Sequence, residues 1–99
     1  MQIKVLSCTR SSKPAVLASV RFELTTYNGE SVIIDDARVF RNKHGQLWVA
    51  MPSYSVPANG GRSYDYLPAV ILSTKLKREV EDAVLPAFEV WEREQGGAR

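Results

Sequence analysis

The centre of the chain holds two apolar runs joined by a short polar turn, and this pattern constrains the fold more than any other. Residues 36–41 and 46–53 carry the apolar side chains, and the turn at 42–45 ends in Gly45. Two β-prone runs separated by such a turn predict a β-hairpin. Pro52 has no N–H to give to a strand ladder, so we expect the second strand to end there.

Alternating apolar and polar residues predict the remaining strands. Residues 15–24 alternate cleanly and residues 2–8 weakly, which indicates strands with one solvated face. Residues 32–41 form the next strand, and we expect a bulge where Asp35 and Asp36 interrupt the alternation. The connections are short, so the sequence predicts an antiparallel meander.

Segment 52–68 is typical of a loop. It contains Pro57 and, near its tip, Gly60 and Gly61. Proline and glycine are the strongest local signals for turns. We expect at most a short edge strand at residues 64–67.

The C-terminal part predicts a helix at about residues 73–95. Its apolar side chains recur at helical spacing and form one stripe: Leu76, Val80, Ala83, Val84, Ala87, Phe88 and Trp91. We expect this stripe to cover Val20, Phe22 and Val49 on the sheet. Pro86 removes one helical N–H, so the helix should kink there or end at Leu85 and restart. The residues after the glycine pair at 96–97 should be frayed.

Together these elements predict one α+β domain over residues 1–99. An antiparallel β-sheet of four to five strands fills about residues 2–67, and an amphipathic C-terminal helix packs on it. A domain of this size buries only about two-thirds of its unfolded surface. A homodimer that pairs sheet edges or strands of the central hairpin would hide exposed strands, so we expect the protein to be dimeric.

Composition narrows the function classes. No apolar run approaches a membrane span and residues 1–5 lack a signal-peptide core, so we expect a cytoplasmic protein. Cys8 is the sole cysteine, which excludes an internal disulfide and a cysteine-cluster metal site. Asp35 and Asp36 are neighbours and point to opposite faces of a strand, and His44 lies in a turn. We therefore expect neither an enzyme nor a cofactor.

Charge is distributed unevenly along the chain. Residues 1–78 hold eleven of the thirteen Lys and Arg against five acids, a balance of +6, whereas residues 79–99 hold two against six, a balance of −4. A basic body suits a polyanionic ligand. Small domains also show such asymmetry by chance.

The start of the predicted helix combines hydroxyl groups with cations: Ser73, Thr74, Lys75, Lys77 and Arg78. Cations are unfavourable at the positive end of the helix dipole unless an anion binds there. Hydroxyls, free first-turn N–H groups and ammonium groups could converge on a phosphate. In the alternative interpretation, Lys75 pairs with Glu79 and Lys77 with Glu81, four residues on.

Four sequence blocks resemble the SpoVG family of bacterial septation and sporulation regulators. They are Asp-x-Arg-Val at 36–39, Leu-Trp-Val-Ala-Met-Pro-Ser at 47–53, Ser-Thr-Lys at 73–75 and Asp-Ala-Val-Leu at 82–85. The resemblance spans roughly residues 32–89. It implies a small dimeric protein that binds nucleic acid and regulates gene expression, with DNA or RNA left open.

This chain departs from the family pattern at two points. Lys75 stands where the family carries arginine, which keeps the charge but loses the bidentate fork. Tyr54 and Ser55 stand where the family usually carries a Lys-Arg pair. Arg62 matches a family arginine and is a candidate backbone contact.

Tyrosines and a strand arginine complete the candidate residues. Tyr54, Tyr64 and Tyr66 could stack on unpaired bases, although such residues more often anchor loops or interfaces. Arg38 either contacts the ligand or forms a salt bridge with Asp36, and we favour the salt bridge. The competing function is a protein-interaction module that uses the tyrosine-bearing loop and the acidic helix face without binding nucleic acid.

Overall fold

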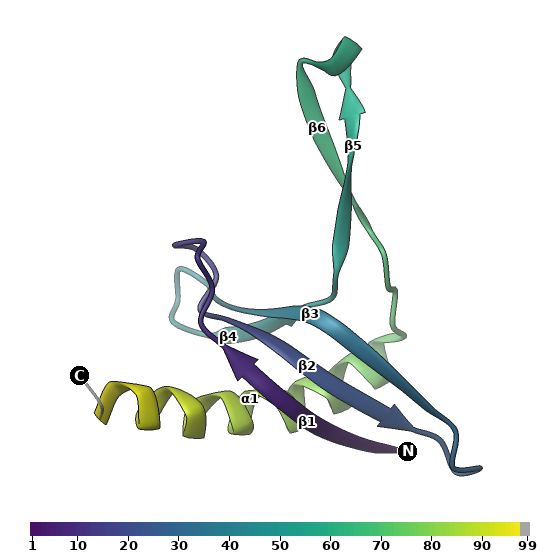
Figure 1. Cartoon of the computed structure of the whole chain (residues 1–99), viewed down its shortest axis with the longest axis vertical. Helices are drawn as coiled ribbons and strands as arrows, with labels where there is room; N and C mark the ends of the chain where they lie inside the picture. The colour runs from purple at the N-terminus through teal and green to yellow at the C-terminus, as the bar shows by residue number, and fades with distance from the viewer. Residues whose placement is uncertain (98–99) are drawn as a thin grey trace.

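The computed structural model describes residues 1–97 and shows an α+β fold (Figure 1). Four antiparallel strands form the main sheet in sequence order: β1 (Gln2–Thr9), β2 (Ala18–Thr25), β3 (Ser31–Arg41) and β4 (Leu47–Ala50). One helix, α1 (Thr74–Gly97), lies across one face of this sheet. No helix among residues 1–97 is both long and apolar enough to cross a membrane. The predicted antiparallel meander is confirmed.

The core lies between α1 and the sheet. Its buried apolar side chains alternate along the strands and recur every four residues along the helix: Ala18, Val20, Phe22, Leu24, Ile34, Ala37, Val39, Val49, Val80, Val84 and Phe88. The predicted helix stripe thus covers the predicted sheet positions. Burying such side chains stabilises the fold by about 25 cal/mol per Å² of apolar surface.

The bulge predicted at Asp35 and Asp36 is present. On β3 the pairing with β2 shifts between Ile34 and Ala37, so the two aspartates have no partners in the ladder. Asp36 adopts a positive φ of 61°, a conformation that Asp tolerates better than most residues. Ile34 and Ala37 are three residues apart, so in a regular strand their side chains would point to opposite faces of the sheet. The bulge adds one residue to β3 and thereby keeps both side chains in the core.

The loop predicted at residues 52–68 is wrong, although the short strand expected at residues 64–67 is present. The segment forms a second, two-stranded antiparallel sheet of β5 (Ser53–Ala58) and β6 (Ser63–Pro68), joined by a 3₁₀ turn, η1 (Asn59–Gly61). Gly60 and Gly61 have φ of 67° and 88°, which their lack of a Cβ permits. Pro52 does separate β4 from β5, as predicted.

The second sheet is an arm that stands away from the main sheet (Figure 1). We call residues 53–68 the arm. Every residue of β6 is exposed. The Cα radius of gyration is 15.0 Å, whereas a compact chain of this length has about 13 Å. The arm therefore adds reach and surface but little core.

Of the two alternatives predicted at Pro86, an end at Leu85 with a restart is wrong, because helical conformation continues through Pro86. Pro86 and Asp82 are both exposed. The Asp82 carbonyl, which loses its usual N–H partner at Pro86, therefore belongs to the exposed side of the helix, where solvent can reach it.

The helix offers a matched pair of valines that tests the core. Val84 is fully buried, whereas Val90 is 45% exposed. We expect Val84→Ala to lower the free energy of unfolding by about 1.5–3 kcal/mol, the contribution of a fully buried valine. Val90→Ala should change it by less than about 0.5 kcal/mol. Urea titration followed by circular dichroism measures both, and equal effects would contradict the described packing.

Candidate nucleic-acid interface

Ser73 caps α1. Its Oγ accepts a hydrogen bond from the Leu76 N–H at 3.2 Å, and its carbonyl accepts the first helical bond from the Lys77 N–H at 2.8 Å. These contacts fit a standard N-cap. The Thr74 and Lys75 N–H groups have no acceptor within residues 1–97. Two donors at the positive end of the helix therefore stay available for an anion.

The cations of the first helical turns are exposed and unpaired within the described chain. Lys75, Lys77 and Arg78 are all exposed, and no carboxylate of residues 1–97 lies within 4.0 Å of their charged nitrogens. The alternative pairs with Glu79 and Glu81 are therefore not formed. We refer to Ser73, Thr74, Lys75, Lys77 and Arg78 as the helix-start cluster.

Glu81 has a different partner. Its Oε2 accepts a hydrogen bond from the Val49 N–H of β4 at 3.1 Å. β4 is an edge strand. One of its edges pairs with β3, where Val49 lies opposite Val39, and the Glu81 carboxylate binds at the other, open edge. This contact draws Glu81 away from Lys77 and fixes the start of α1 beside β4.

A groove connects the helix-start cluster to the base of the arm. Lys77 lines it together with Ser53 and Pro68, the first and last arm residues. Apolar side chains form the remainder of this wall, which we call the arm-base groove: Trp48, Ala50, Met51, Val70, Ile71 and Leu72. Tyr54 does not line this groove itself, but it directly follows Ser53 on β5 and is half exposed.

Arg62 lies at the opposite end of the arm. It follows the η1 turn, next to Ser63, whereas the arm joins the body at Ser53 and Pro68. Six strand residues at about 3.3 Å each span about 20 Å. Within one copy, Arg62 and the helix-start cluster therefore cannot contact the same phosphate.

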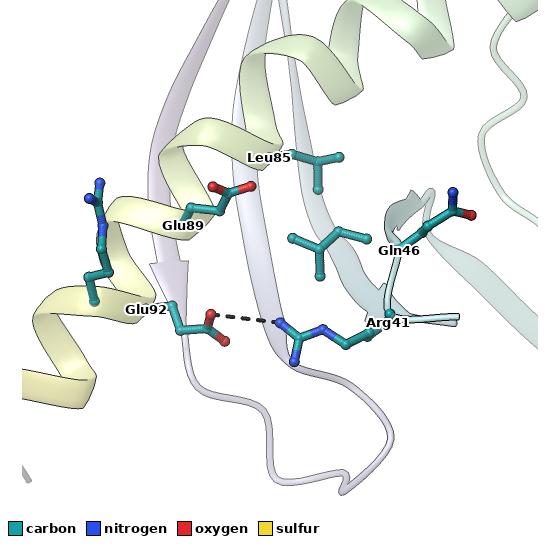
Figure 2. A pocket seen from close by; sticks show the side chains of 8 residues that line it. Arg41, Gln46, Leu85, Glu89 and Glu92 are labelled. Carbon is teal, nitrogen blue, oxygen red and sulfur yellow. Dashed lines mark ion pairs between the residues drawn. The ribbon is translucent and has the colours of Figure 1, made fainter. Parts of the chain in front are cut away.

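A second depression lies between the β3–β4 turn and the C-terminal half of α1 (Figure 2). Arg41 points toward Glu92, with 3.8 Å between Nη2 and Oε1. Arg93 and Glu89 also line it, so its charges balance. A balanced site does not attract a polyanion, and this depression is a less suitable nucleic-acid surface than the helix-start cluster.

The other candidate residues have structural roles. Arg38 forms the favoured salt bridge, with Nη2 3.1 Å from Oδ2 of Asp36. His44 is exposed in the β3–β4 turn, where its N–H donates to Asn42. Burial raises the pKa of the Cys8 thiol, which disfavours its reactive thiolate. Among residues 1–97, no three His, Cys, Asp or Glu side chains gather to hold a metal.

The sequence did not reveal the arm-base groove. Ile71, in the connector between the arm and α1, is 81% exposed, and Trp48 is 39% exposed. Trp48 stacks on Phe40 across β3 and β4, with ring centroids 4.8 Å apart. Two signals in the sequence could have indicated the groove. One is the apolar Ile71 in a short connector, and the other is the apolar Trp48 at a solvent-facing position of an edge strand.

The cap makes a testable prediction. Ser73→Ala removes the hydrogen bond to the Leu76 N–H and should lower the free energy of unfolding by about 1 kcal/mol. Ser73→Asp keeps an acceptor and should retain stability, while its negative charge should weaken any anion bound at the helix start. Urea unfolding of both variants measures the first effect, and equal losses would contradict the capping geometry.

Comparison with known proteins gives no match. No protein-family model, no curated protein and no solved structure matches this chain. The resemblance to SpoVG accordingly depends on the four sequence blocks alone and stays a prediction.

Proposed function

We propose that this protein is a SpoVG-like nucleic-acid-binding regulator of bacterial gene expression that acts as a homodimer. The observation that carries the proposal is the helix-start cluster. Lys75, Lys77 and Arg78 are exposed, without an acid partner in the described chain, and adjacent to two free N–H groups.

The energetics favour an anionic ligand at this place. An exposed cation in the first turn costs about 0.3–1 kcal/mol through the helix dipole. Glu81, which could offset Lys77, is held by Val49 instead. A phosphate at the helix start would neutralise the cations and accept hydrogen bonds from Thr74 and Lys75, as phosphates do at other helix N-termini.

The ligand would bind mainly through its backbone. Phosphate contacts position a protein on nucleic acid and carry little sequence information, so selectivity should be modest. The half-exposed ring of Tyr54, which follows the groove residue Ser53, would stack on an unpaired base in this proposal. Both DNA and RNA supply the required phosphates, and the residues do not choose between them.

A protein-interaction module is the second candidate. The exposed tyrosines of the arm favour it, because tyrosine is enriched in interfaces. The acids on the exposed side of α1, including Glu79, Asp82 and Glu89, would offer the charged part of such a surface. This function requires no nucleic acid.

Replacing the three cations separates the two functions. We expect wild-type protein to bind labelled duplex DNA or single-stranded RNA with a steep salt dependence in fluorescence anisotropy. The triple variant Lys75→Ala, Lys77→Ala, Arg78→Ala should lose binding, and each single variant should flatten the slope of log K against log salt by about 0.7–0.9.

A variant of equal charge provides the control. Lys4, Lys13 and Lys43 are exposed and lie outside the helix-start cluster. Changing these three to alanine removes the same net charge and should leave most of the affinity. Equal losses in both triple variants would mean that net charge alone drives binding. If the wild type does not bind at low salt, the nucleic-acid proposal is wrong and the protein-interaction module is the favoured function.

A further inference from the structure

Large apolar side chains are exposed in the arm-base groove. Ile71 is 81% exposed and Trp48 is 39% exposed, and both line the groove, whose volume is about 450 Å³. Sites for small organic groups have volumes of about 300–1,000 Å³. The groove is therefore large enough for a ring system, and a ring that fills it removes apolar surface from water.

Trp48 has one ring face that no aromatic neighbour covers. Its indole stacks on the Phe40 ring, with centroids 4.8 Å apart and an angle of 18° between the ring planes. Phe40 is its cross-strand neighbour on β3, whereas β4 is the last strand of the main sheet. The opposite face of the indole is therefore turned toward the open edge of β4. A flat ring placed against that face would extend the stack.

The charge around the groove restricts the kind of ligand. Among the described residues that line it, Lys77 is the one with a charged side chain. Lys77 has no acidic partner within residues 1–97, and Lys75 and Arg78 add positive charge beside it. The occupant that matches this site combines an apolar ring with negative charge. An aliphatic protein segment would match the apolar wall alone.

A nucleotide supplies both parts. Its base has flat faces that stack on aromatic side chains, and its phosphate carries the negative charge. Lys77 and Trp48 line the same groove, so a single nucleotide is long enough to contact both. In a duplex, the neighbouring base pairs cover the faces of each base. A ring face is accessible to the groove only where a base is unpaired and unstacked.

We propose that the arm-base groove holds an unpaired base of single-stranded nucleic acid, which stacks on Trp48 while its phosphate binds Lys77. The protein consequently prefers single strands to duplexes of the same sequence. This inference rests on the proposed function and narrows its ligand to one structural class. Every base has a flat face, so the stacking itself adds little sequence selectivity.

Abasic DNA tests the role of the base without a change in the protein. A single-stranded oligonucleotide and an abasic strand of the same length carry the same phosphates. In fluorescence anisotropy at one salt concentration, wild type should bind the complete strand roughly 5- to 150-fold more tightly, the range for one stacked base. Wild type should also bind the complete strand more tightly than the duplex formed with its complement.

Variants at Trp48 test what the base stacks on. Trp48→Ala should weaken binding of the complete strand by the same factor and leave the abasic strand and the duplex unchanged, because those two bind through phosphates. The variant should therefore no longer distinguish the complete strand from the abasic strand. Trp48→Phe keeps a flat ring and should retain most of the affinity.

Two further variants control for the fold and for aromatic content. Ile71 is 81% exposed, so Ile71→Ser should leave the circular dichroism unchanged while it weakens binding of the complete strand alone. Tyr27 is 94% exposed in the turn between β2 and β3, outside the groove. Tyr27→Ala should leave the affinity for all three ligands unchanged.

The outcomes separate this inference from the proposed function. If wild type binds no nucleic acid at low salt, the proposed function is wrong and this inference is wrong with it. If wild type binds the complete strand, the abasic strand and the duplex equally, the proposed function stands, but the groove holds no base and is open to an apolar protein segment. Equal losses by Trp48→Ala on the complete and abasic strands would also contradict stacking, because they would reflect a change in fold.

Discussion

The packing of α1 against the main sheet is the contact on which every other feature depends. Val80, Val84 and Phe88 insert fully into the core formed by the inner side chains of the strands. This contact fixes the rotation of the helix, and the rotation decides what its other residues reach. Glu81 meets the outer side of β4, and the cations next to it stay in solvent. The helix start is also set beside the arm base, because the connector at residues 69–73 is short.

Much of the fold follows from sequence patterns because most elements have one buried face. The strand at residues 18–25 and the apolar stripe on α1 can be recognised from the spacing of their apolar residues. The aspartate pair in β3 correctly predicted a bulge. The arm was missed for the opposite reason. Its strands bury neither face, so no alternation appears, and Pro57 suggests a loop. Pro57 is compatible with a strand only because it occupies a non-bonded position, a property that the register decides and the local sequence does not.

The candidate site was predictable in its residue types and unpredictable in its connections. Cations at the start of a capped helix can be recognised from the chain alone. The sequence does not show that these cations lack acidic partners, because i,i+4 pairs with Glu79 and Glu81 were equally compatible with it. A long-range contact, Glu81 to Val49, decides against one of these pairs. The separation of Arg62 from the cluster likewise follows from the arm, which sequence patterns did not reveal.

The hydrogen bond from Val49 to Glu81 has a consequence for assembly. Stacking of sheets edge to edge into a filament requires two open edges in every copy. β4 is short, and the Glu81 carboxylate, which can accept but not donate, takes an outward donor that a neighbouring strand would need. The main sheet thus has β1 as its one accessible long edge among the described residues, and contacts through it close after two copies. Through its main sheet alone, the protein therefore forms closed pairs and not edge-to-edge filaments.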